Sequence, residues 1–165
     1  MAARDNRAFS TFVAVLVLLH LALHVGFGWG ANTPDLIAVA VLLSARRLSS
    51  PRAALLGLVL GLLADALSLN AFGASAVALV AVAWLGSRSR DLFEGGSLGF
   101  IGLYVFIGKW LADAIYLLVA PAGGPAGRPW GSLLAEAPLR ALITAVAGVL
   151  ALAVYRALVG EHRGR

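Results

Sequence analysis

Six charged side chains lie inside or at the ends of otherwise apolar stretches of this sequence, where a charge is costly. A charge near the centre of a membrane-spanning helix costs about 2.5–3.5 kcal/mol on insertion scales, so such side chains pair with one another or line a path for ions or protons. We therefore treat the six as an intramembrane charge network and ask which of these two chemistries their spacing favours. The network consists of Asp35, Asp65, Lys109, Asp113, Glu136 and Arg140.

Asp65 belongs to a stripe of small residues in an apolar run that carries no other charge. Gly57 and Gly61 precede it by two turns and one turn, and residues four apart share one face of a helix. Glycines on such a face let a second backbone come close. The spacing predicts a tight helix-packing contact, either within this chain or with a partner's helix. Because intramembrane charges usually pair, we expect Asp65 to bind Lys109 or Arg140, with ion or proton handling as the alternative.

Two further pairs of charged residues have the spacing that brings side chains together on a helix. Lys109 and Asp113 are four residues apart, and so are Glu136 and Arg140. Pairs of opposite charge at this spacing stabilise a helix surface. We therefore expect both to be structural ion pairs.

Catalytic and metal-binding patterns find little support in the sequence. His20 and His24 are four apart, which suits two ligands of one metal ion, but no third ligand is evident. The sequence has no nucleophile and base at a spacing typical of a catalytic pair, no zincin motif and no phosphate-binding loop. An Asp65–Asp113 pair would be loosely similar to intramembrane aspartyl proteases, whose characteristic motifs are absent. We predict no enzymatic activity, no cofactor and no metal site.

The composition indicates the kind of molecule that must hold these residues. Of the 165 residues, 61% are hydrophobic and 13% are charged, and the mean hydropathy is +0.91. Soluble domains carry roughly a quarter charged residues, so the chain is predicted to be a single integral membrane domain. It has no cysteine, which excludes disulfides and thiolate chemistry. In a membrane protein, the placement of the positive charges that give the net charge of +5 indicates topology and does not indicate a nucleic-acid-binding surface.

The apolar segments predict an all-α membrane protein with six transmembrane helices. The second helix is the shortest: Thr33 can cap it, Pro34 suits its first position, and Asp35 complements the helix dipole. Its apolar part is about 18 Å long, against about 30 Å of hydrocarbon, and bilayer thinning or snorkelling of Arg46 and Arg47 would cover the shortfall. The predicted helices cover residues 9–26, 34–46, 53–69, 73–86, 97–120 and 132–158.

The distribution of basic residues predicts the orientation of these helices. If the N-terminus is cytoplasmic and all six helices cross, the outer loops hold only Arg128, and Lys109 and Arg140 fall in or near helices. This asymmetry follows the positive-inside rule, so both termini are expected in the cytoplasm and the charge network in the outer half of the membrane. The remaining ten basic residues then lie inside: Arg4, Arg7, Arg46, Arg47, Arg52, Arg88, Arg90, Arg156, Arg163 and Arg165.

Several short motifs resemble the MreD family of rod shape-determining proteins. They are the Pro34-Asp35-Leu36 start of the second helix, the glycine-rich stretch from Leu56 to Ser68 with Asp65 late in it, and the following segment Phe72-Gly73-Ala74-Ser75-Ala76. Asp113 also resembles a recurring acidic position of that family. The match is best over residues 34–79, while the length and the six-helix topology extend it over the chain.

The resemblance implies a non-enzymatic scaffold of the cell-elongation (rod) complex in the bacterial inner (cytoplasmic) membrane. Such proteins bind MreC and help to organise peptidoglycan synthesis and cell shape. They act, directly or indirectly, with the RodA glycosyltransferase, its partner transpeptidase and MreB filaments. The partners implied here are therefore MreC, the elongation machinery and membrane lipids, and not nucleic acid.

Two alternative functions remain open from the sequence. The family is similar in architecture to the substrate-binding subunits of ECF-type (energy-coupling-factor) vitamin transporters, so the chain could bind a vitamin-like small molecule. Those subunits usually carry an Ala-x-x-x-Ala face on their first helix, which the segment Ala14-Val15-Leu16-Val17-Leu18 lacks. A third interpretation is an ion- or proton-coupled carrier that uses Asp65. The scaffold is the interpretation that the motifs favour.

Overall fold

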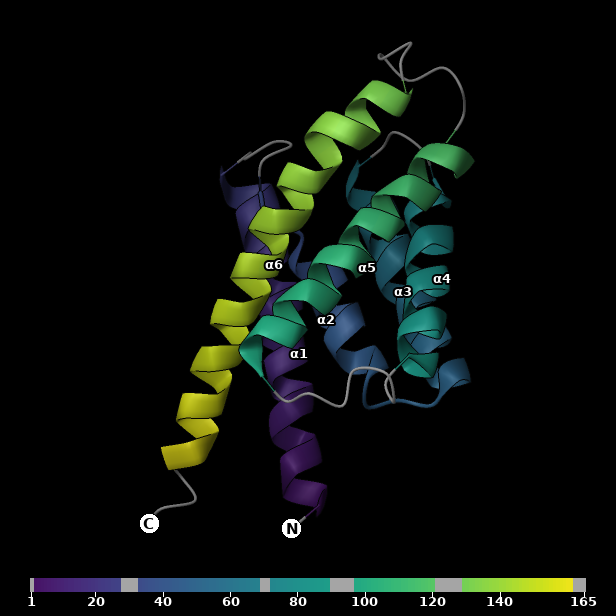
Figure 1. Cartoon of the computed structure of the whole chain (residues 1–165). Coiled ribbons are helices and arrows are strands. Elements are labelled where there is room, and N and C mark those ends of the chain that lie inside the picture. Colours follow the sequence, from purple (N-terminus) through teal and green to yellow (C-terminus); the bar gives the residue numbers. More distant parts are fainter. Residues whose placement is uncertain (1, 28–32, 69–71, 90–96, 121–128, 162–165) are drawn as a thin grey trace.

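The computed structural model describes residues 2–27, 33–68, 72–89, 97–120 and 129–161 (Figure 1). These residues form six helices and no strand, which confirms the predicted all-α class. The bounds of the helices, in chain order, are α1 Ala2–Phe27, α2 Leu36–Ala45, α3 Ser50–Ser68, α4 Ala74–Arg88, α5 Leu98–Val119 and α6 Pro129–Glu161.

The bounds of three helices differ from the predicted ones by three residues or more, and α6 also ends three residues later than predicted. Helix α1 begins seven residues earlier than predicted, and α3 and α6 each begin three residues earlier. The start of α2 also differs, because Asp35 and not Thr33 is the N-cap: its side chain accepts the backbone N–H of Ala38 at 3.0 Å. Pro34 therefore lies before the helix and not at its first position.

Four of the helices are long and apolar enough to cross a membrane. The spans are Asn6–His24 in α1, Ser50–Leu67 in α3, Leu98–Val119 in α5 and Leu133–Val159 in α6, whereas α2 and α4 are shorter apolar helices. Large apolar side chains on these spans point outward, such as Leu18 in α1. An apolar surface of this extent marks a contact with lipid or with another protein. The chain is thus a membrane protein by the length and composition of its helices.

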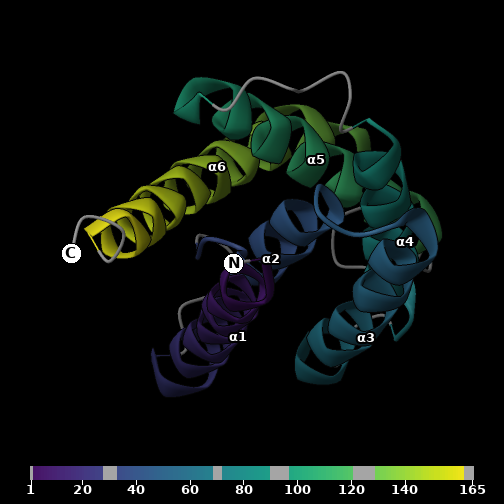
Figure 2. The same ribbon diagram turned by 90° about the horizontal axis from the view of Figure 1, so that it is seen from below.

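Helix α2 occupies the centre of the molecule. Its ten residues are all buried, and it contacts each of the other five helices. Seen from below, α2 lies in the middle of the ring that the other helices form (Figure 2). A helix that is apolar on every side is buried, and at about 15 Å this one covers only half of a bilayer's hydrocarbon. Neighbouring helices therefore surround α2, so its short length requires no thinning of the bilayer.

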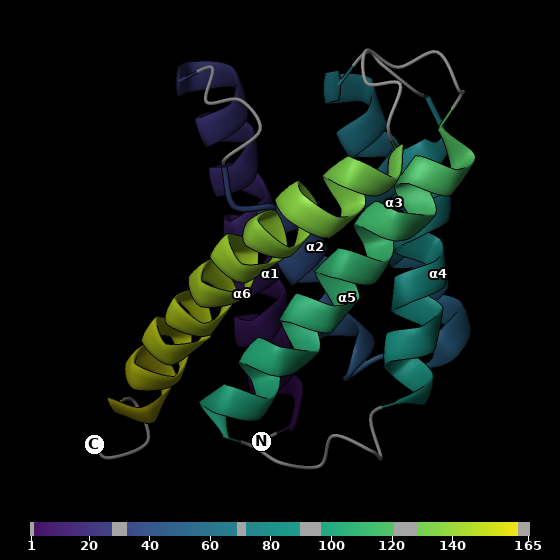
Figure 3. The ribbon, with the colours of Figure 1, turned by 45° about the horizontal axis from the view of Figure 1, so that its top comes forward.

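Successive helices run in opposite directions, and the start of α1 lies at the same end of the molecule as the end of α6 (Figures 1 and 3). Helices α3 and α4 form one closely packed pair, and α5 and α6 form a second. The end of α2 carries Arg46 and Arg47, whose guanidinium groups lie 5.6 Å from the ring centre of Tyr104 and 3.8 Å from that of Phe9. These cation–π contacts hold basic side chains at the end of the molecule that the arginine distribution predicts to be cytoplasmic.

Candidate functional site

Asp65 is buried at the junction between α3 and α4. Its carboxylate accepts three backbone N–H groups, from Gly73 at 2.9 Å, Ser75 at 3.0 Å and Ala76 at 3.1 Å. The first amides of a helix have no partner within the helix, and the helix dipole favours a negative charge there. The N-cap residue Gly73 has a φ of 96° and no side chain to accept these amides. Asp65 therefore caps α4 from the preceding helix.

The structure places Lys109 and Arg140, the two expected partners of Asp65, beside other acids. Lys109 lies between Asp35 and Asp113, and Arg140 binds Glu136. The sequence does hold a signal for the observed contact, because Asp65 precedes Gly73 by only eight residues, across a short turn. A helix that begins at a glycine needs its exposed amides satisfied from elsewhere, and the nearest carboxylate along the chain is Asp65.

The two glycines of the stripe face α4 across the same junction. A Cβ atom on Gly57 would lie 2.5 Å from the carbonyl oxygen of Leu79, and one on Gly61 would lie 2.8 Å from the backbone nitrogen of Ala76. Both distances are too short to admit a Cβ atom at either position, so the backbones of α3 and α4 are in contact at these two glycines. The stripe is therefore a contact within the chain, and α4 occupies the face that a partner's helix would need.

A second junction, which is half-buried and which we name the Lys109 cluster, consists of Asp35, Lys109, Asp113 and Thr144. The ammonium nitrogen of Lys109 lies 2.8 Å from Asp35 Oδ2 and 2.7 Å from Asp113 Oδ1, and the lysine side chain is only 12% exposed. The Lys109–Asp113 contact is the one expected from the four-residue spacing on α5. Asp35 joins it from the start of α2, which lies 74 residues earlier in the chain.

Thr144 ties α6 into the Lys109 cluster. Its buried hydroxyl oxygen accepts the backbone N–H of Asp35 at 3.1 Å. The cluster therefore joins the start of α2 to both α5 and α6. Thr144 was not predicted from the sequence, although a lone hydroxyl in the apolar stretch 141–154 is a signal of a polar contact between helices.

One oxygen of the Lys109 cluster lacks a partner. Asp113 Oδ2 is buried and has no hydrogen bond from the described residues. On α1, His20 lies within electrostatic reach of Asp35 and Lys109. His20 also stacks on His24, with ring centres 5.8 Å apart. Within the part of the chain that the structure describes, no three His, Cys, Asp or Glu residues are grouped to hold a metal ion.

The Glu136–Arg140 pair lies outside both junctions. Its atoms are 2.8 Å apart, and the side chains are 61% and 40% exposed. An exposed pair of this kind contributes about 0–1 kcal/mol in water. The six charged residues thus form three separate arrangements: the amide-bound Asp65, the Lys109 cluster, and this exposed pair on α6.

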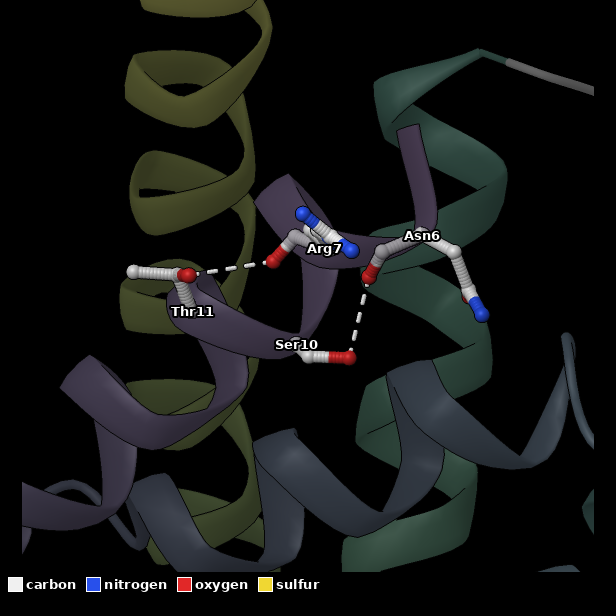
Figure 4. Close-up of a pocket in the computed structure, with 4 residues that line it drawn as sticks. All are labelled: Asn6, Arg7, Ser10 and Thr11. Carbon is white, nitrogen blue, oxygen red and sulfur yellow. Dashed lines mark hydrogen bonds between the residues drawn. The ribbon is translucent and has the colours of Figure 1, made fainter. Parts of the chain in front are cut away.

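A depression on the surface of α1 has no part in these junctions. Asn6, Arg7, Ser10 and Thr11 line it, and the hydroxyls of Ser10 and Thr11 donate to the backbone carbonyls of Asn6 and Arg7 at 2.9 and 3.0 Å (Figure 4). All four residues come from adjacent turns of one helix, at the opposite end of α1 from His20. The hydroxyls are used within the helix, so the depression offers little to recognise a ligand.

Comparisons with known proteins give no match: no family model, no curated protein and no solved structure is similar to this chain. Its function must therefore be inferred from its residues and their geometry.

Proposed function

We propose that this chain is a non-enzymatic membrane scaffold of the MreD type, which binds MreC in the cell-elongation complex. The observation that carries the proposal is how the motif residues meet. Asp35 and Asp113 share the ammonium group of Lys109, and Asp65 binds the turn at residues 73–76. Residues that matched the family only by apolar composition would have no reason to meet in two junctions between helices. The contacts between these motif residues support the MreD-type architecture.

The rigidity of the two junctions supports a scaffold over a moving carrier. Asp65 is held by three backbone amides, and the glycine-lined contact between α3 and α4 leaves no space for sliding. A scaffold needs such a fixed body, with apolar outer faces for lipid and for a partner's membrane helix. We place this body in the inner membrane with both termini cytoplasmic. There MreC would link it to RodA, its partner transpeptidase and MreB.

The competing function is a vitamin-binding subunit of a transporter. The unpartnered oxygen of Asp113 is the feature that favours it, because a ligand's donor group could bind there. This function predicts that a vitamin-like molecule raises the thermal unfolding temperature of the purified chain. The scaffold function predicts no such shift with a panel of vitamins.

Removing the chain from its host cells tests the scaffold function. We expect wider cells and slower incorporation of labelled peptidoglycan precursor into the side wall. Gly99→Leu should restore normal width, because a Cβ at Gly99 meets nothing within 4 Å, whereas Gly61→Leu should not, because its side chain enters the contact with α4. Normal width without the chain would overturn the proposal, and growth restored by an added vitamin would favour the transporter.

A further inference from the structure

The charges of the Lys109 cluster do not balance when both acids are ionised. One ammonium group, on Lys109, faces two carboxylates, those of Asp35 and Asp113. Their side chains are 12%, 29% and 22% exposed, so the cluster has little access to water. An uncompensated charge in such a place is strongly unfavourable unless the group is neutralised. One proton bound to the cluster would make it neutral.

The two carboxylates have different surroundings, which decides where that proton binds. Asp35 Oδ2 binds Lys109 and Asp35 Oδ1 accepts the N–H of Ala38, at the start of α2 where the helix dipole favours an anion. Asp113 Oδ1 also binds Lys109, but Asp113 Oδ2 exposes less than 1 Å² and has no partner among the described residues. When two neighbouring acids are surrounded so differently, one stays ionised and the other takes the proton.

The charged groups on the neighbouring helices do not change this assignment. Arg140 on α6 is the next cation within reach of Asp113, but it already binds Glu136 at 2.8 Å and is 40% exposed. His20 on α1 lies within electrostatic reach of Asp35 and Lys109. No cation other than Lys109 therefore contacts Asp113 within the described part of the chain.

We propose that Asp113 is a proton-binding site, with the proton on Oδ2 at neutral pH and with Asp35 as the ionised partner of Lys109. A metal ion fits this place poorly, because the ammonium group already lies between the two carboxylates. Release of the proton would leave a net negative charge where α2, α5 and α6 meet. Protonation is thereby linked to the packing of these three helices. This inference does not depend on whether the chain binds MreC.

Infrared spectroscopy of the full-length chain in lipid nanodiscs tests the proposal. At pH 7 the wild type should show the C=O stretching band of a protonated carboxyl group, and Asp113→Asn should lack it. The matched control is Glu136→Gln, which removes an exposed acid and should keep the band. A wild type without the band, or a band that survives in Asp113→Asn, would overturn the assignment.

The thermal stability of the same proteins gives a second readout. The amide of Asp113→Asn has the charge and nearly the shape of a protonated carboxyl group, so this variant should fold and unfold at the wild-type temperature at pH 7. As the pH rises, the wild type should lose stability through release of the proton, while Asp113→Asn should lose less. A variant that cannot fold at pH 7, or that shows the same pH dependence as the wild type, would contradict the proposal.

Discussion

Asp65 shows how one buried carboxylate can stabilise a membrane fold through backbone amides. Three amide N–H groups at the N-terminus of α4 donate to it, and the dipole of that helix favours its negative charge. Hydrogen bonds to a charged group each contribute about 1.5–3 kcal/mol, more than neutral ones. The capping role also explains why the acid lies at the end of α3, since only there can its side chain reach the first turn of α4.

Asparagine should therefore be a poor substitute for Asp65, despite its similar shape. Oδ1 accepts one amide and Oδ2 accepts two, so the NH2 group of asparagine would face at least one N–H donor. We expect Asp65→Asn to lower the free energy of unfolding by about 2 kcal/mol or more. Denaturant titration in detergent micelles measures this loss.

The control for this substitution is Glu136→Gln, which changes an exposed acid of α6 by the same chemistry. Its effect should stay within about 0.5 kcal/mol, as is usual for an exposed ion pair. Equal stability of Asp65→Asn and wild type would show that the three amide contacts contribute little.

At the scale of the helices, the short α2 is held at both ends by polar contacts from other helices. At its start, Thr144 accepts the backbone N–H of Asp35. Near its end, the hydroxyl of buried Tyr104 donates to the carbonyl of Leu42 at 3.0 Å, one of the carbonyls that lacks a partner within the helix. Both contacts come from the α5–α6 pair, which thereby fixes the position of the central helix.

The close contact between α3 and α4 leads to a prediction with a matched pair of glycines. Gly61→Ala would place a methyl group against the Cα atom of Ala76, so the two helices must move apart, at a cost of about 1–3 kcal/mol. Gly99→Ala adds the same group in open space at the start of α5 and should be neutral or slightly stabilising. Thermal unfolding of both variants measures the difference, and equal unfolding temperatures would rule out a tight α3–α4 contact.

The helices could be predicted from the sequence, but most of the contacts between them could not. Long apolar runs between polar turns predict six helices, and the four-residue spacing predicts the Lys109–Asp113 pair. The third member, Asp35, could not be assigned, because its distance from Lys109 depends on how α2 and α5 pack together. The amide partners of Asp65 were not predicted, because a charge within an apolar helix indicates a cation as partner, while the free amides at the start of α4 are backbone groups without a charged side chain to mark them in the sequence.

At the scale of the whole molecule, two closely packed pairs and one long helix enclose a short central helix. The pairs α3–α4 and α5–α6 each have their own junction, and the Lys109 cluster connects the second pair to α2. The contacts of Asp65 and of the Lys109 cluster thus lie between helices, while many large apolar side chains, such as Leu18, are exposed on the outward faces. This layout leaves the outer surface free for lipid and for a partner within the membrane.

The absence of cysteine allows a direct test of the proposed orientation. Phe72 is 79% exposed before α4, on the side expected to face outward, and the exposed Ser49 precedes α3 on the side expected to be cytoplasmic. A membrane-impermeant thiol reagent should label Phe72→Cys in spheroplasts with intact inner membranes, and Ser49→Cys only after lysis. The reverse pattern would contradict the orientation, and labelling of both from outside would show that α3 does not cross.

The amount of MreC recovered with the chain from native membranes tests the scaffold function most directly. A tagged wild-type chain, solubilised in mild detergent, should bring MreC down as a major protein, and Gly61→Ala should recover less of it than Gly99→Ala does. If MreC is no more abundant with the folded wild-type chain than with an unrelated tagged membrane protein, the scaffold function is contradicted.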